Sequence, residues 1–129
     1  MNIPKDLKYT EEHEWVKVSG DTATIGITDF AQGELGDIVY VEVDTVGGEL
    51  EKGDVLGIIE AVKTTSDMYT PVSGEVLEVN PEITEDDGDN PALINEDPYG
   101  KGWIAKIKIS DESELDDLLS AEAYEELVS

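Results

Sequence analysis

The chain has 129 residues, no cysteine and a single histidine, and its 32 acidic residues outnumber the eight basic ones to give a net charge of −24. That length suits one domain over residues 1–129. Without cysteine the chain cannot form disulfides, and with one histidine we expect neither a metal site nor a histidine-based catalytic triad. Because nucleic acids and anionic membranes are recognised by basic surfaces, neither is an expected partner.

The beginning of the chain predicts a cytoplasmic protein with a β hairpin. Residues 1–10 lack the basic and apolar stretches of a signal peptide, and no apolar run is long enough for a membrane helix. Residues 14–18 lead into a Ser-Gly-Asp turn, and residues 22–27 then alternate, with Ala23, Ile25 and Ile27 on one face. This pattern is typical of paired strands. Thr28-Asp29 can cap a short helix over residues 30–35, which Gly36 would end.

The middle of the chain predicts four further extended segments and a polar break. Residues 37–43 form the strongest strand pattern because they are rich in β-branched residues. Residues 55–62 follow as a second strand. The polar residues Lys63-Thr64-Thr65 end this strand, and residues 66–71 form another extended segment. A turn then leads into a strand over residues 75–79.

The last third predicts one strand and a helical tail. Residues 80–102 are rich in loop residues, with a short helix at residues 91–94 that Asn90 would cap. Residues 103–109 alternate cleanly as a strand. The period then changes to a helical one over about residues 111–127, which would cover an open end of the sheets.

Two details complete the expected fold. Asp111 and Glu114 have the spacing of a capping box at the start of the tail, and Ser120 can start a second helix. A weak internal repeat relates residues 36–39 to residues 74–77, each opening a strand. Two similar β halves predict a mainly β, flattened barrel or sandwich, with short helices and a C-terminal helical segment.

Lys63 is the candidate functional residue. It is the only lysine between residues 53 and 100, and it lies at the expected tip of a hairpin. An enzyme that modifies one lysine among eight needs that lysine on a rigid, protruding turn, and two paired strands provide one. The alternative is an ordinary surface lysine without a special role.

The segment around Lys63 resembles the lipoyl-attachment segment of the glycine cleavage system H protein family. This segment, residues 53–67, reads GDVLGIIEAVKTTSD. Four flanking segments match the family as well: KYTEEHEWV within residues 7–16, TIGITD at residues 24–29, PVSGEV at residues 71–76 and NEDPYGKGW at residues 95–103. The resemblance covers about residues 5–127.

The resemblance implies a carrier and not an enzyme. It implies a fold of the lipoyl and biotinyl carrier type, with a core at about residues 22–104, and lipoic acid attached to Lys63 through an amide. The implied partners are glycine decarboxylase (P protein), aminomethyltransferase (T protein), dihydrolipoyl dehydrogenase (L protein) and a lipoate-attaching enzyme. Glu14 and Asp67 resemble the acids that line the groove for the loaded arm, whereas Glu34 replaces a histidine found in some members.

Other interpretations stay open at this point. A biotin carrier usually has methionine on both sides of the modified lysine, but the neighbours here are Val62 and Thr64. A lipoyl domain of a 2-oxoacid dehydrogenase usually shows Asp-Lys-Ala at the tip. An H-like lipoyl depot, a lipoyl carrier in sulfur metabolism and an unmodified acidic β domain are the remaining alternatives.

Overall fold

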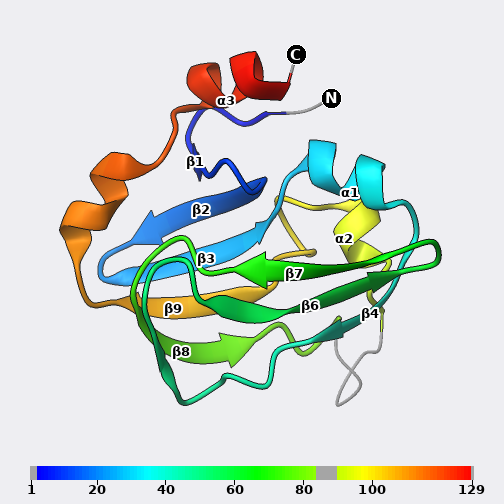
Figure 1. Cartoon of the computed structure of the whole chain (residues 1–129), viewed down its shortest axis with the longest axis horizontal. Helices are drawn as coiled ribbons and strands as arrows, with labels where there is room; N and C mark the ends of the chain where they lie inside the picture. The colour runs from blue at the N-terminus through cyan, green and yellow to red at the C-terminus, as the bar shows by residue number, and fades with distance from the viewer. Residues whose placement is uncertain (1–2, 84–89, 129) are drawn as a thin grey trace.

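The structure is a computed structural model that describes residues 3–83 and 90–128, and it consists of two antiparallel sheets with short helices (Figure 1). The six-stranded sheet has the order β1 (Lys8–Tyr9), β2 (Glu14–Ser19), β3 (Thr22–Ile27), β9 (Ala105–Ile109), β8 (Gly74–Val79) and β5 (Glu49–Leu50). The three-stranded sheet has the order β4 (Ile38–Glu42), β6 (Val55–Ala61) and β7 (Thr65–Tyr69). The helices are α1 (Asp29–Leu35), α2 (Leu93–Glu96), the 3₁₀ helix η1 (Glu112–Asp117) and α3 (Ala121–Val128).

The two sheets face each other as an open β sandwich, which confirms the predicted mainly β class. The sandwich is not closed into a barrel in the part of the chain that the structure describes. Its core lies between the sheets, with Ile25 and Ile107 contributed by the larger sheet and Leu56 and Met68 by the smaller one, all four buried. The inward side chains come from alternate positions because successive residues of a strand point to opposite faces.

The predicted hairpin and the first helix are confirmed. β2 and β3 pair from Glu14 opposite Ile27 to Ser19 opposite Thr22. The Thr28 hydroxyl accepts a hydrogen bond from the Ala31 amide at 3.2 Å and caps α1 as expected.

The helix after the loop-rich stretch begins later than predicted. α2 starts at Leu93 and not at Pro91, and no side chain caps it. Pro91 and Ala92 instead form a turn, in which the Leu93 amide donates to the Asn90 carbonyl. Residues 84–89 of the predicted loop lie outside the described residues.

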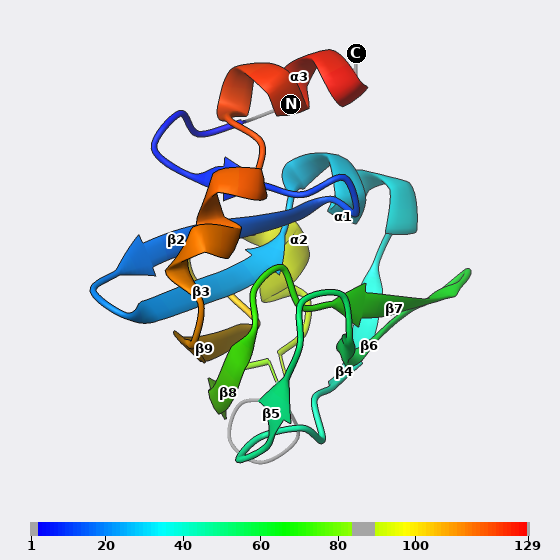
Figure 2. The ribbon, with the colours of Figure 1, turned by 60° about the vertical axis from the view of Figure 1, so that its left-hand side comes forward.

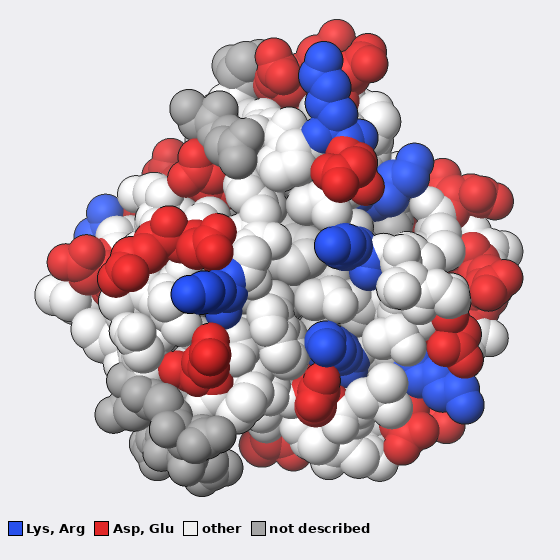
Figure 3. Space-filling view, turned by 180° about the vertical axis from the view of Figure 1, so that it is seen from behind, with Lys and Arg blue, Asp and Glu red and all other residues white. Residues whose placement is uncertain are grey.

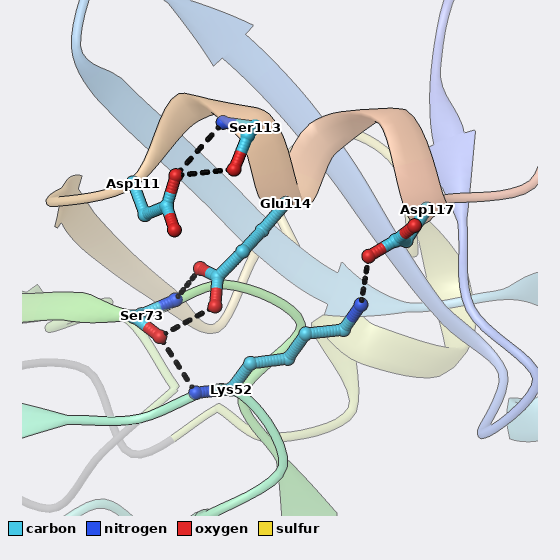
Figure 4. Close-up of polar contacts among 6 residues, drawn as sticks. All are labelled: Lys52, Ser73, Asp111, Ser113, Glu114 and Asp117. Carbon is cyan, nitrogen blue, oxygen red and sulfur yellow. Dashed lines mark hydrogen bonds and ion pairs between the residues drawn. The ribbon is translucent and has the colours of Figure 1, made fainter.

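The predicted capping box at the start of the C-terminal segment is wrong in detail (Figure 4). Asp111 caps η1 by accepting from the amide and the hydroxyl of Ser113. The Glu114 amide donates to the Asp111 carbonyl, but the Glu114 side chain does not reach back to the Asp111 amide. Its carboxylate accepts from the Ser73 amide at 2.7 Å and from the Ser73 hydroxyl at 2.8 Å, and so ties η1 to the turn before β8. Lys52 adds an exposed ion pair with Asp117 at 3.3 Å.

A second, smaller cluster lies where the ends of the chain meet. α3 packs beside β1 (Figures 1 and 2), as expected for a helix that covers an open end of the sheets. The cluster contains the buried Tyr9, Trp15, Ala121 and Tyr124. As a result the first three residues of β2, Glu14 to Val16, are covered on both faces, by the main core and by this cluster.

The outer face of the six-stranded sheet carries some of the few lysines of the protein. Lys106 and Lys108 on β9 lie opposite Glu78 and Glu75 on β8, and Lys106 Nζ is 3.3 Å from Glu78 Oε1. From behind, several lysines are visible among acidic residues (Figure 3). None of the described helices is long and apolar enough to cross a membrane.

Candidate functional site

Lys63 lies at the tip of the β6–β7 hairpin, as predicted. The hairpin projects from the body of the molecule (Figure 2), and Lys63 is exposed. Two backbone hydrogen bonds hold the tip: the Ala61 amide donates to the Thr64 carbonyl at 2.8 Å, and the Val62 amide donates to the Asp37 carbonyl at 3.0 Å. The lysine is therefore displayed on a fixed support and not on a loose loop.

The aliphatic part of Lys63 passes over Gly36, which ends α1. Gly36 has a φ of +81°, and its amide donates to the Gln32 carbonyl at 2.9 Å. A Cβ added at Gly36 would lie 3.4 Å from Lys63 Cε. Glycine thus provides the left-handed backbone that terminates the helix and leaves space for the lysine side chain.

A cavity of about 460 Å³ lies between α1, the residues around the start of β2, and β7. One part of its lining is apolar and another part is acidic. The lining residues are Glu12, His13, Glu14, Ile27, Phe30, Ala31, Glu34, Leu35, Ile59, Ser66, Asp67 and Met68. The cavity therefore suits an apolar group with a cationic end.

The structure brings the two predicted groove residues, Glu14 and Asp67, to this one cavity, together with Glu34. Lys63 is not among the lining residues. Phe30, Ala31, Glu34 and Leu35 come from one face of α1, since residues three and four positions apart on a helix are neighbours. That face could have been read from the sequence, but its partner surface on β7 could not.

Glu14 is buried, with only 3% of it exposed. Its carboxylate accepts from the Thr10 hydroxyl at 2.9 Å and from the Tyr69 amide at 3.1 Å. Burial raises the pKa of Glu14 to about 7, although both hydrogen bonds act in the opposite direction. No lysine forms an ion pair with Glu14 within residues 3–83 and 90–128.

Asp67 differs from Glu14 in its surroundings. It lies on β7 opposite Ile58 of β6 and is exposed to solvent. Glu14 is thus a buried carboxyl group at the start of β2, and Asp67 is a solvated one on the hairpin that carries Lys63. A cationic group in the cavity would meet both environments.

His13 is packed beside the first strands and also lines the cavity. Its ring lies against Phe30, with 4.9 Å between the ring centroids, and burial lowers the pKa of His13. Its Nδ1 lies 2.9 Å from the Tyr124 hydroxyl. Sequence reasoning missed Tyr124, which lies 111 positions further along the chain. In the described part of the chain no group of three or more histidine, aspartate or glutamate side chains could hold a metal ion.

An open β sandwich with one lysine on a fixed hairpin tip, next to an acidic and apolar cavity, is the arrangement of a carrier domain. Comparison with known proteins defines the family. Residues 7–129 match the family model described as "Glycine cleavage H-protein". The chain belongs to this family.

Individual relatives agree with this assignment. The chain is 59% identical to the glycine cleavage system H protein of Carboxydothermus hydrogenoformans, over 98% of this chain and 94% of that protein. It is 54% identical to the H protein of Bacteroides thetaiotaomicron, over 100% and 99% of the two chains. The crystal structure of an H protein from Mycobacterium marinum superposes with a TM-score of 0.81 at 37% identity, covering 95% of each chain.

Proposed function

We propose that the protein is the lipoyl carrier of the glycine cleavage system, with lipoic acid joined to Lys63 through an amide. The observation that carries the proposal is the position of Lys63, exposed at a hairpin tip that two backbone hydrogen bonds hold in place. Family membership supports a role within the same system. The alternative of a biotin carrier has no comparable support.

The composition of the chain suits such a group. When attached, lipoic acid supplies a dithiolane that accepts an aminomethyl group and electrons. Because the chain has no cysteine, it has no thiol of its own that could compete for the aminomethyl group or the electrons. Tethering at Lys63 raises the effective concentration of the arm at each partner's active site.

The cavity would shelter the loaded end of the arm. Ile59, Met68 and the α1 face offer apolar contact, and Glu14 and Asp67 offer carboxylates to a cationic amine. The partners in this proposal are the P protein, which loads the aminomethyl group, the T protein, which removes it, the L protein, which reoxidises the dithiol, and a lipoate-attaching enzyme. The protein itself does not catalyse a step, and its cytoplasmic location stays a prediction.

Intact mass spectrometry tests the attachment. Wild-type protein from the native host should be heavier by one lipoyl group, and Lys63→Arg should not, because a guanidinium cannot form this amide. Lys101→Arg is the matched control, since Lys101 is also an exposed lysine in a turn. A modified Lys63→Arg protein would contradict the assignment. A lipoylated protein that fails to support glycine cleavage with P, T and L proteins would point to a lipoyl relay instead.

A further inference from the structure

The C-terminal helix reaches the wall of the cavity through one hydroxyl group. Tyr124 on α3 is fully buried, and its ring stacks on Tyr9, with 4.8 Å between the ring centroids. Its hydroxyl lies 2.9 Å from His13 Nδ1 and 2.6 Å from Thr28 Oγ1. A single group from the end of the chain thus joins two segments near its beginning.

Both partners of this hydroxyl shape the cavity. His13 lines it directly and has a φ of +69°, a backbone conformation that a residue other than glycine adopts only when its surroundings fix it. Thr28 caps α1, the helix that provides the opposite lining from Phe30 to Leu35. The Thr28 amide also donates to the His13 carbonyl at 3.0 Å.

The hydrogen bonds form one continuous chain. The Ala31 amide donates to Thr28 Oγ1, the Thr28 hydroxyl can donate to the Tyr124 oxygen, and the Tyr124 hydroxyl can donate to His13 Nδ1. This direction uses each donor once and requires neutral His13 with its proton on Nε2. Bonds linked in this way strengthen one another in a buried site.

We propose that Tyr124 is a positioning residue for the arm cavity, through which α3 fixes the His13 segment and the first turn of α1 relative to each other. The inference rests on the proposed function. A phenylalanine would fill the same stack beside Tyr9, so packing alone does not require the hydroxyl. The two groups within hydrogen-bonding distance of that hydroxyl are a lining residue of the cavity and the cap of the helix that lines it.

The experiment compares two substitutions in one stacked pair. Tyr124→Phe removes the hydroxyl at the cavity wall, and Tyr9→Phe removes the hydroxyl that donates to the Pro4 carbonyl. The reduced arm is loaded with formaldehyde and ammonia, and its lifetime is followed without T protein. Decay consumes one water and releases formaldehyde and ammonia, which returns the thiol.

We expect Tyr124→Phe to shorten this lifetime by about three- to tenfold, as the loss of a buried hydrogen bond would, and Tyr9→Phe to leave it unchanged even where both variants melt earlier. Lipoylation at Lys63 is measured first in all three proteins. A wild-type protein without lipoate refutes the proposed function. Normal lipoylation with equal lifetimes in Tyr124→Phe and wild type refutes the role of Tyr124 alone.

A second set of variants tests the hydrogen-bond chain itself. Thr28→Val should shorten the lifetime, whereas Thr28→Ser, which keeps the hydroxyl, should not. Adding Tyr124→Phe to Thr28→Val should bring no further shortening, because the link is already broken. Additive effects of Thr28→Val and Tyr124→Phe on the lifetime would overturn the inference. Equal lifetimes for Thr28→Val and Thr28→Ser would also overturn it, and this comparison can be made even if Tyr124→Phe fails to fold.

Discussion

The effect of Glu14→Gln on the free energy of unfolding should change sign as the pH rises. The substitution should destabilise the protein in acid and stabilise it above pH 7. Glu14 is buried without a cationic partner in the described structure, and its pKa is raised from 4.5 to about 7. Between these values the folded protein binds more protons than the unfolded chain. The free energy of unfolding of the wild type therefore falls across this range, and the part due to Glu14 is fully present only below about pH 4.5.

The magnitude follows from the same shift. A rise in pKa from 4.5 to about 7 corresponds to about 3 kcal/mol. Glutamine does not titrate, but it has one acceptor oxygen where Glu14 uses two, so it loses the bond to Thr10 or to Tyr69 at a cost of about 1 kcal/mol. Glu14→Gln should thus be about 1 kcal/mol less stable than wild type in acid and about 2 kcal/mol more stable above pH 7.

Urea denaturation over a pH series at fixed ionic strength measures this difference. Comparing the variant with wild type at each pH removes most of the contribution of the other acids, which both proteins share. Asp67→Asn is the matched control, because it also removes one carboxylate from the cavity lining but from an exposed position. A difference between Glu14→Gln and wild type that stays constant with pH would refute the reasoning.

Three further predictions concern stability. Gly57→Ala should destabilise the protein by about 1–3 kcal/mol, because the new Cβ would lie 2.5 Å from the Glu42 carbonyl oxygen in the β4–β6 pair; an unchanged urea midpoint would contradict this. Glu114→Ala should cost about 1–3 kcal/mol through the loss of both bonds to Ser73, whereas Asp117→Asn, at an exposed ion pair, should cost less than about 1 kcal/mol, and similar losses would speak against the difference. With a net charge of −24, the melting temperature should rise between low and molar salt, and a flat response would exclude self-repulsion as a major term.

Local patterns were enough to predict most of the elements and the place of Lys63. The β2–β3 hairpin has a short polar turn before an alternating stretch, and the helix after it begins at a capping threonine. Lys63 follows an apolar strand and precedes a second extended stretch, so its position at a tip depends only on near neighbours. These features need no information about distant parts of the chain.

The environment of Glu14 depends on distant parts of the chain and could not be predicted. In β2 the consecutive residues Glu14, Trp15 and Val16 are all buried, because the main core covers one face and the α3 cluster covers the other. Burial therefore does not alternate along these three residues, and a rule based on alternation cannot predict that the Glu14 side chain is buried. The Trp15 indole donates to the Pro98 carbonyl at 2.9 Å, a contact that no local pattern indicates.

The same distant packing explains why a buried acid fits the proposed carrier. Keeping Glu14 ionised at neutral pH costs folding free energy, and a protein could remove that cost with a single substitution to glutamine. A cationic amine in the cavity would offset it, because an opposite charge favours the ionised carboxyl group. In the proposed carrier, the free energy lost by ionising Glu14 in the empty cavity would be regained when the cationic arm binds, and a neutral arm would regain none of it. Glu14 would in this way hold the arm only while it carries the aminomethyl group.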